Sequence, residues 1–493
     1  MPTARQTPAF SDVACNRFLT RDSKEIQIFW KNIMPCLRNY LLRCVTLTYL
    51  GCLVSIGTAA SRNSYDLIPD SAPDQQQFVQ VQMEVRGELR SNPDGGGVQT
   101  RPLEVEARLR YQERMRERSE DPWKRRAARH YEEAFASIRV GESLVNRRLP
   151  PEQALILVTA ETGDQRLFAP DQPLRREELE LLDVQASSVL VERLLPGRPV
   201  ALEERWAVEP PVLADVFSLD AVQEADVEGV LVGVEESTAR IEWTGRIEGS
   251  AGGVAADLAV RARGNFDLQQ RRLIWFAVSM RETRAIGHAQ PGFEVTARLQ
   301  MTLRPSPEGD VLTERRLAGL AWEEPNSRLL RYQPARSHYR LLADRRWRAL
   351  IDRHDLSVLR LVDRGELVAQ CNISELPDAD PGQHLALEAF QTQIRQTLGE
   401  QFGQFVAATQ EGGSEGRRVL RVAVAGLASG IPIQWVYYHI STPDGRQVAF
   451  AFTLESREVA RLGTLDREMI ESFEFLPRPA APRAARMASP ARS

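Results

Sequence analysis

Apolar residues alternate with polar ones over long stretches between residues 76 and 303. The clearest runs are Val79, Val81, Met83, Val85 and Leu89; Leu103, Val105, Ala107 and Leu109; Ala239, Ile241, Trp243 and Ile247; and Val295, Ala297, Leu299, Met301 and Leu303. A period of two puts successive side chains on opposite faces of a β-strand. Short turns separate the runs. The pattern therefore predicts a large antiparallel sheet with one packed face and one more exposed face.

Helical patterns are scarce in the same region. Asp121-Pro122 is typical of a helix start, and apolar residues follow it at helical spacing, which predicts a helix over 122–139. A short helix is predicted over 173–182. A curved sheet with so few helices closes on itself, exposes an apolar surface, or holds a ligand or partner there. Trp243 and Trp275 lie on strands of this sheet and mark the candidate apolar ligand face.

The alternation stops at 305–336, and a different order of elements follows. A hairpin is predicted over 356–373, and an amphipathic helix has apolar residues at steps of three and four from Leu387 to Phe405. A second hairpin, 433–455, turns at Pro443-Asp444-Gly445, before a short closing helix and strand. A chain of 493 residues is too long for one ordinary core, so we interpret the break as a linker between two domains.

The order of elements over 337–477, which closes on a helix that leads into Ser472-Phe473, resembles the PsbP/DcrB-like family. That resemblance implies an α-β-α sandwich in an exported protein that acts as an accessory or assembly factor, and it brings no catalytic motif. The sheet of residues 76–305 faintly resembles the curved half-barrels of LolA-like lipoprotein carriers.

The N-terminal region has the three-part order of a secretory signal peptide that starts at Met34. Arg38 and Arg43 form its basic part, and an uncharged, mainly apolar run covers 45–57. The predicted cleavage region is Ala59, Ala60 and Ser61. The sequence therefore predicts export to the periplasm or cell envelope. The alternative is an uncleaved signal in which residues 41–60 anchor the protein in the inner membrane, and this is the only membrane association that we expect.

Charge and cysteine content restrict the classes of partner and site. The net charge is only −4, so electrostatics do not favour nucleic acid. Of the five cysteines, only Cys371 lies after residue 55, so the folded region cannot form an internal disulfide. The histidines are scattered, and no Cys/His spacing fits a metal site. We therefore predict no cofactor and no metal.

Residues that carry chemistry in other proteins have simpler explanations here. The aromatic cluster at 435–439 alternates along a strand, which favours a wall of the core. Cys371 is in phase with apolar neighbours, so we expect a buried, unreactive thiol. The segment GLASG (426–430) differs from the nucleophile elbow GxSxG because its serine is one place late. No catalytic residue is predicted.

The predicted fold class is α+β, with two domains: a large curved antiparallel sheet with few helices, then an α-β-α sandwich built on an antiparallel sheet. The predicted divisions are 1–33 (leader or mis-assigned start), 34–60 (signal peptide), 61–75 (linker), 76–305 (sheet domain), 306–336 (linker), 337–477 (PsbP/DcrB-like domain) and 478–493 (disordered tail). We expect a non-enzymatic envelope protein that acts as a binding, scaffold or assembly-accessory module on an envelope protein or an apolar ligand. The alternatives are a hydrolase with dispersed active-site residues and a carrier of an apolar ligand.

Overall fold

The structure is a computed structural model that describes residues 63–70, 76–92, 97–116, 124–161, 163–306, 311–322, 327–335, 337–353, 355–412 and 416–477. The leader, the signal peptide with Ala59, Ala60 and Ser61, and the tail all lie outside these residues. In the part that is described, no helix is long and apolar enough to cross a membrane.

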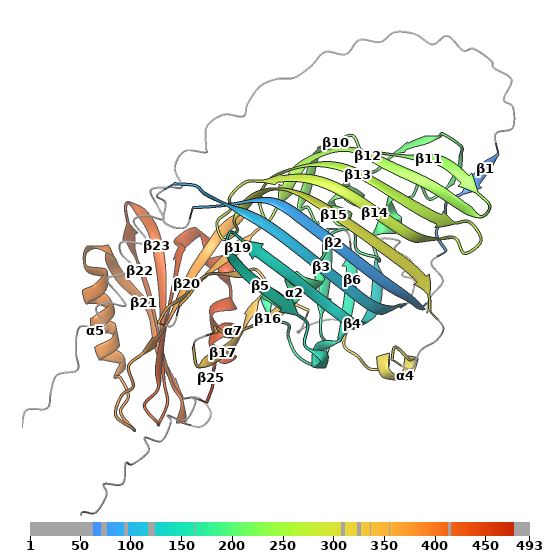
Figure 1. Cartoon of the computed structure of the whole chain (residues 1–493). Helices are drawn as coiled ribbons and strands as arrows, with labels where there is room; N and C mark the ends of the chain where they lie inside the picture. Colours follow the sequence, from blue (N-terminus) through green and yellow to red (C-terminus); the bar gives the residue numbers. More distant parts are fainter. Residues whose placement is uncertain are drawn as a thin grey trace, which may run out of the picture.

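A 13-stranded antiparallel sheet forms the larger part of the molecule (Figure 1). Its main order is β7-β6-β4-β3-β2-β15-β14-β13-β12-β11-β9, with β5 paired to β4 and β10 paired to β12. The strands are β2 (Gln76–Ser91), β3 (Gln99–Met115), β4 (Arg125–Val140), β5 (Ser143–Arg148), β6 (Leu155–Glu161), β7 (Asp164–Phe168), β9 (Arg205–Ala207), β10 (Ala221–Ala225), β11 (Glu228–Glu235), β12 (Thr238–Ala251), β13 (Val254–Asp267), β14 (Arg272–Arg284) and β15 (Gly292–Pro305). The alternating runs of the sequence are long strands of this sheet, as predicted.

One face of the 13-stranded sheet, which we call the core face, packs on the short helices of the same region. These are η2 (Val191–Leu194), α2 (Arg176–Leu182) and α3 (Pro210–Phe217), and their apolar residues belong to the same hydrophobic cluster as the sheet. Leu213 and Val216 of α3 are fully buried there. Two smaller elements, η1 (Pro151–Gln153) and the pair β1 (Ser64–Asp66) with β8 (Pro199–Ala201), complete this region. The sheet therefore curves around its own helices.

The prediction of a helix over 122–139 is wrong, because residues 125–140 are strand β4, paired with β3 and β6. A β-bulge explains the misleading spacing. The register shifts so that Tyr131 faces Tyr111 while Glu133 faces Arg110, which leaves Glu132 as the extra residue. Core-facing positions are odd-numbered before the bulge and even-numbered after it, so the buried residues Tyr131 and Ala134 are three apart, as in a helix.

A 7-stranded antiparallel sheet forms the second part of the chain, in the order β18-β19-β20-β24-β23-β22-β21. Its strands are β18 (Trp347–Asp352), β19 (Ser357–Asp363), β20 (Glu366–Leu376), β21 (Phe402–Gly412), β22 (Arg418–Ala428), β23 (Ile431–Ser441) and β24 (Gln447–Glu455). Helix α5 (Leu387–Leu398) packs on one face, and α6 (Val459–Leu462) and α7 (Leu465–Glu471) pack on the other. Beside it lie β16 (Leu329–Tyr332), β17 (Tyr339–Asp344) and β25 (Glu474–Phe475), which form a 3-stranded sheet.

The predicted helix from Leu387 to Phe405 is too long at its C-terminal end. Gly399 adopts a φ of +51°, a left-handed value that ends α5 at Leu398. The 3-10 turn η3 (Gly399–Gln401) follows, and Phe402 and Phe405 lie on strand β21 instead. A second 3-10 turn, η5 (Ser456–Glu458), leads into α6.

Parts of both predicted linkers are packed rather than free. Leu67 is fully buried in the core of the 13-stranded sheet. Leu312 is also fully buried, in a separate small cluster where it packs with Leu317 of α4 (Glu314–Leu317) against β4, β6 and β7. The molecule as a whole consists mostly of antiparallel strands arranged in several sheets, with few and short helices, which fits the α+β class.

Two groups of contacts join the large sheets. Arg176 of α2 donates to the carbonyl oxygens of Arg345 and Trp347, at the start of β18. At the far end, the β12–β13 turn touches the β19–β20 turn, where a Cβ on Gly253 would collide with Gly365. Both glycines also have left-handed φ values, so this close approach of two turns depends on glycine at both positions.

Candidate functional site

Trp243 and Trp275 lie on opposite faces of the 13-stranded sheet, so the structure does not bring them together on one ligand face. Trp243 is 2% exposed on the core face, and its indole N–H donates to the carbonyl oxygen of Leu194 at 3.1 Å. Trp275 precedes the buried Phe276 on β14 and is only partly buried, on the other side. We call that side, opposite the core face, the outer face.

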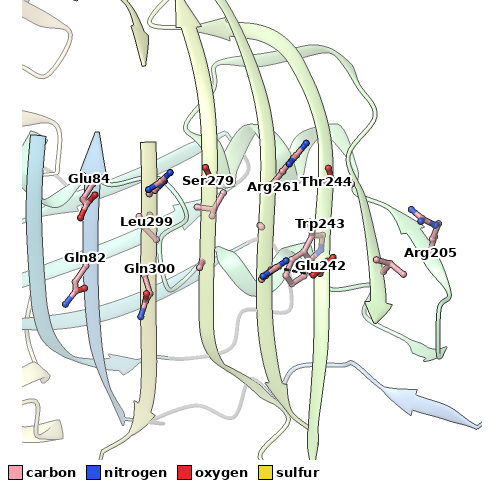
Figure 2. Close-up of a pocket in the computed structure, with 16 residues that line it drawn as sticks. Gln82, Glu84, Arg205, Glu242, Trp243, Thr244, Arg261, Ser279, Leu299 and Gln300 are labelled. Atoms are coloured by element: carbon pink, nitrogen blue, oxygen red, sulfur yellow. Dashed lines mark ion pairs between the residues drawn. The ribbon is translucent and has the colours of Figure 1, made fainter. Parts of the chain in front are cut away.

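The outer face is hollowed into a trough with a volume of about 800 Å³ (Figure 2). Its lining comes from seven adjacent strands, β2, β15, β14, β13, β12, β11 and β9. The strand register arranges the outer-face side chains in two rows. The first row is Gln82, Gln300, Ala277, Arg263, Glu242, Val230 and Arg205, and the second is Glu84, Arg298, Ser279, Arg261 and Thr244. The trough therefore runs across the strands rather than along them.

The floor between the rows is main chain. The residues that alternate with the two rows, Leu299, Val278, Ala262 and Trp243, also line the trough, but their side chains are buried on the core face. The middle of the trough is open because Ala277 and Ser279 on β14 have small side chains. Their neighbours on β13 and β15 have longer side chains. With strands about 4.8 Å apart, seven strands give a trough length of roughly 29 Å.

Four arginines supply the positive charge of the trough, and they differ in their partners. Arg263 pairs with Glu242 at 3.0 Å, and Arg205 pairs with Glu228 at 3.3 Å. Among the described residues, Arg261 and Arg298 make no ion pair, and each projects from an exposed position beside Ser279. Two guanidinium groups that flank a hydroxyl present a set of hydrogen-bond donors to an anionic group.

A second polar cluster lies on the core face and is completely enclosed. The Glu113 carboxylate is 0% exposed and accepts from Arg129 Nε at 2.8 Å, from Ser188 Oγ at 2.8 Å and from Gln77 Nε2 at 2.6 Å. Burial raises the pKa of the neighbouring Tyr111 hydroxyl, which bonds to Ser188 Oγ at 3.0 Å. These bonds connect β2, β3 and β4 to the segment before η2, so the cluster fixes that segment on the sheet.

Residues that resemble catalytic groups lie in the 7-stranded sheet or beside it, and the two nucleophile candidates, Ser441 and Cys371, are buried. His384 Nδ1 and Ser441 Oγ are 2.8 Å apart, the spacing of a base and a nucleophile, but Ser441 is 1% exposed. Cys371 is fully buried in the core. The cluster Trp435, Tyr437, Tyr438 and His439 is buried as well, which confirms the prediction of a core wall. In the described ranges, no group of three His, Cys, Asp or Glu side chains is placed to hold a metal.

The arginines of the trough are functional candidates that the sequence alone does not single out. They occupy polar positions of the alternating runs, which is the only signal that they carry in the sequence. The alternation shows that Arg261 and Arg298 face outward, but only the pairing of β13, β14 and β15 shows that they flank the same serine.

Comparisons with known proteins give weak similarities. No protein-family model matches the chain, and no curated protein matches it in sequence. Among solved structures, cyanobacterial PsbP from Synechocystis is 15% identical, with 34% of this chain and 98% of that chain covered and a TM-score of 0.25. Lipovitellin is 9% identical, with coverages of 52% and 28% and a TM-score of 0.25. DynF from the dynemicin pathway of Micromonospora chersina is 8% identical, with coverages of 52% and 95% and a TM-score of 0.13.

These comparisons support a distant PsbP-like similarity and do not show a LolA-like one. TM-scores this low carry no argument about function.

Proposed function

We propose that the protein is an exported, non-enzymatic envelope protein that binds a partner through the trough on its outer face. In this proposal the 13-stranded and 7-stranded sheets are the cores of two domains, and the second is a PsbP/DcrB-like α-β-α sandwich. The single observation that carries the proposal is the trough, a polar hollow across seven strands whose side chains are free to contact a ligand.

The geometry favours the outer face over the core face as a binding surface. A carrier of an apolar ligand needs an apolar space, and the core face is filled by side chains of the chain itself. Trp243, Phe276 and Leu213, from two strands and a helix, are each at most 2% exposed in one continuous cluster. A hydrolase needs an accessible nucleophile, and Ser441, whose hydroxyl lies beside His384, is 1% exposed.

Site-specific photo-crosslinking in cells tests the proposal. A photoreactive amino acid replaces Ser279, in the middle of the trough, and in a control it replaces Thr283, which lies on the outer face of the same strand but outside the trough. We expect a discrete adduct from position 279 and none from position 283. Equal adducts from both positions, or none from either, would contradict a binding role for the trough.

Export is tested on the same cells by the intact mass of the native protein. The signal-peptide prediction expects an N-terminus near Ala60 or Ser61 in the envelope fraction. A membrane-bound product that retains residues 41–60 would support the anchored alternative. A cytosolic product that begins at Met1 would contradict export.

A further inference from the structure

The five central strands of the trough, β2, β15, β14, β13 and β12, have no free edge, which restricts how a ligand can bind there, whereas β9 at the end of the sheet is an edge strand of only three residues. β14 is bonded to β13 on one side and to β15 on the other, and β2 and β12 are likewise paired on both sides. An extended peptide that binds by strand addition needs unpaired main-chain groups at an edge strand. Recognition in the middle of the trough therefore depends on side chains that project from the outer face.

Arg298, Ser279 and Arg261 are direct cross-strand neighbours on β15, β14 and β13. At about 4.8 Å per strand, the two arginine Cα atoms are roughly 10 Å apart, so both side chains can reach one group held above the serine. Guanidinium binds carboxylates in a planar, bidentate way, and the serine hydroxyl adds a third donor. This triplet has the charge and the geometry to clamp a carboxylate.

The rest of the trough is suited to uncharged hydroxyl groups rather than to further anions. Gln82 and Gln300 face each other across β2 and β15 and offer both amide donors and acceptors. Glu84 and Glu242 place negative charge along the same surface, which disfavours a polymer with a phosphate at every unit. The ligand therefore carries carboxylates at intervals, separated by hydrogen-bonding groups.

An aromatic surface lies beside this polar trough. Trp275 faces Thr302 and Asn265 across the neighbouring strands, and it stands on the outer face two residues before Ala277. A partly exposed indole provides a flat, apolar platform next to polar groups. A uronic acid chain has flat sugar faces that fit the aromatic platform and hydroxyl groups that fit the planar polar side chains. Its acidic groups fit the carboxylate clamp.

We propose that the trough binds an acidic polysaccharide, with a uronate carboxylate held by Arg261, Ser279 and Arg298 and a sugar ring on Trp275. This inference rests on the proposed function, because it assigns a ligand class to the same trough. The trough is roughly 29 Å long across its seven strands, and this length accommodates several sugar units in extended form.

Calorimetric titration of the mature protein with a hexameric oligogalacturonate tests the inference. We expect binding that weakens as salt is added, because exposed charges are screened. The double variant Arg261→Gln/Arg298→Gln should weaken binding about tenfold or more, which corresponds to about 1.4 kcal/mol. Trp275→Ala should weaken it several-fold. Arg108→Gln, on the outer face of β3 outside the trough, should bind like the unaltered protein.

Two further ligands test whether binding requires both the sugar and its negative charge. An uncharged oligosaccharide of the same length should bind much more weakly, and so should a poly-glutamate of the same charge. Equal binding of poly-glutamate would overturn the inference in favour of an acidic peptide. Equal binding of the uncharged sugar would show that Arg261, Ser279 and Arg298 do not hold a carboxylate, and would overturn the inference as well. Absence of oligogalacturonate binding, or binding that the double variant leaves unchanged, would also overturn it. A position-279 adduct that persists in that case leaves the proposed function intact.

Discussion

The two large sheets of this molecule differ in how many of their faces are covered. In the 7-stranded sheet both faces are packed, by α5 on one side and by α6 and α7 on the other. In the 13-stranded sheet, helices cover the core face, whereas the central strands of the outer face carry polar side chains. Figure 1 shows α5 and α7 on opposite sides of the 7-stranded sheet. This difference is why the proposed binding surface lies on the 13-stranded sheet, because a sheet packed on both sides has no face left for a partner.

The same difference is present in single strands. In β24, Val448 to Phe452 are all buried, with Phe450 on one side and Ala451 on the other. In β13, buried and exposed residues alternate for most of its length. Continuous burial is expected for a strand between two layers and alternation for a strand with one solvated face. The local sequence pattern therefore reports the number of packed layers.

Introducing a charge at equivalent positions in the two sheets should give the largest effect. Ala451→Glu puts a carboxylate in the core beneath α5, where Ala451 is 1% exposed, without a partner for the charge. We expect a loss of several kcal/mol, enough to prevent stable folding of the 7-stranded sheet. Urea unfolding, or the soluble fraction where the variant does not fold, measures the effect.

The matched control is Ala259→Glu, on the outer face of β13 and outside the trough. A charge there remains in contact with water, so we expect a change within about 0.5 kcal/mol. If Ala259→Glu is as destabilising as Ala451→Glu, the outer face is covered and the comparison between the sheets fails.

The fold was predictable wherever a single sequence pattern determined the local structure. Alternation located the long strands, and Pro443-Asp444-Gly445 located the turn of the hairpin β23–β24. The prediction failed at β4, where the bulge at Glu132 changed the phase of the strand and imitated helical spacing. It also failed after Leu398, where the apolar residues of β21 continue the spacing of α5 by coincidence. In both cases the deciding interaction is the pairing with another strand, β3 and β6 for β4 and β22 for β21, which the spacing within one segment does not show.

The buried and exposed Arg–Glu pairs of the 13-stranded sheet should differ strongly in their contribution to stability. Glu113→Ala leaves the Arg129 guanidinium, which is 2% exposed, in the core without its carboxylate partner. We expect a loss of about 3–5 kcal/mol in the free energy of unfolding. Chemical denaturation followed by tryptophan fluorescence measures it.

Glu242→Ala is the control on the outer face. Its partner Arg263 has a side chain that is 73% exposed, so the loss of this pair should cost at most about 1 kcal/mol. Similar losses for the two variants would mean that Glu113 and Arg129 are hydrated in solution, and that the core face is less tightly packed than the structure shows.

The candidate site was less predictable than the fold, for a related reason. The sequence marks Trp243 and Trp275 because aromatic residues are conspicuous, but their phase on different strands puts them on opposite faces of the sheet. Arg298, Ser279 and Arg261 are inconspicuous polar residues that become a site only through the register of three strands. The pairing of strands brings together the side chains of a sheet surface, so the sequence of any single strand cannot show which residues form a site.

A dependence of stability on pH is expected in the 7-stranded sheet, which is covered on both faces. His439 is buried in β23, with Nε2 bonded to Gln447 Oε1 at 2.9 Å, and among the described residues Nδ1 has no hydrogen-bond partner. Burial lowers the pKa of His439 from 6.5 to about 4. Between these values the unfolded chain binds a proton at this position and the folded chain does not, so the free energy of unfolding rises with pH.

We therefore expect the free energy of unfolding to be constant above about pH 7.5 and to fall, as the pH decreases from 6.5 toward 4, by about 3 kcal/mol in all. Urea denaturation at a series of pH values measures the slope, and His439→Gln identifies its source. All other titrating groups are unchanged in that variant, so the difference between the two profiles isolates His439. Profiles that run parallel through this range would show that water or a counter-charge reaches the imidazole. The 7-stranded sheet would then have an accessible face, and the contrast with the 13-stranded sheet would no longer hold.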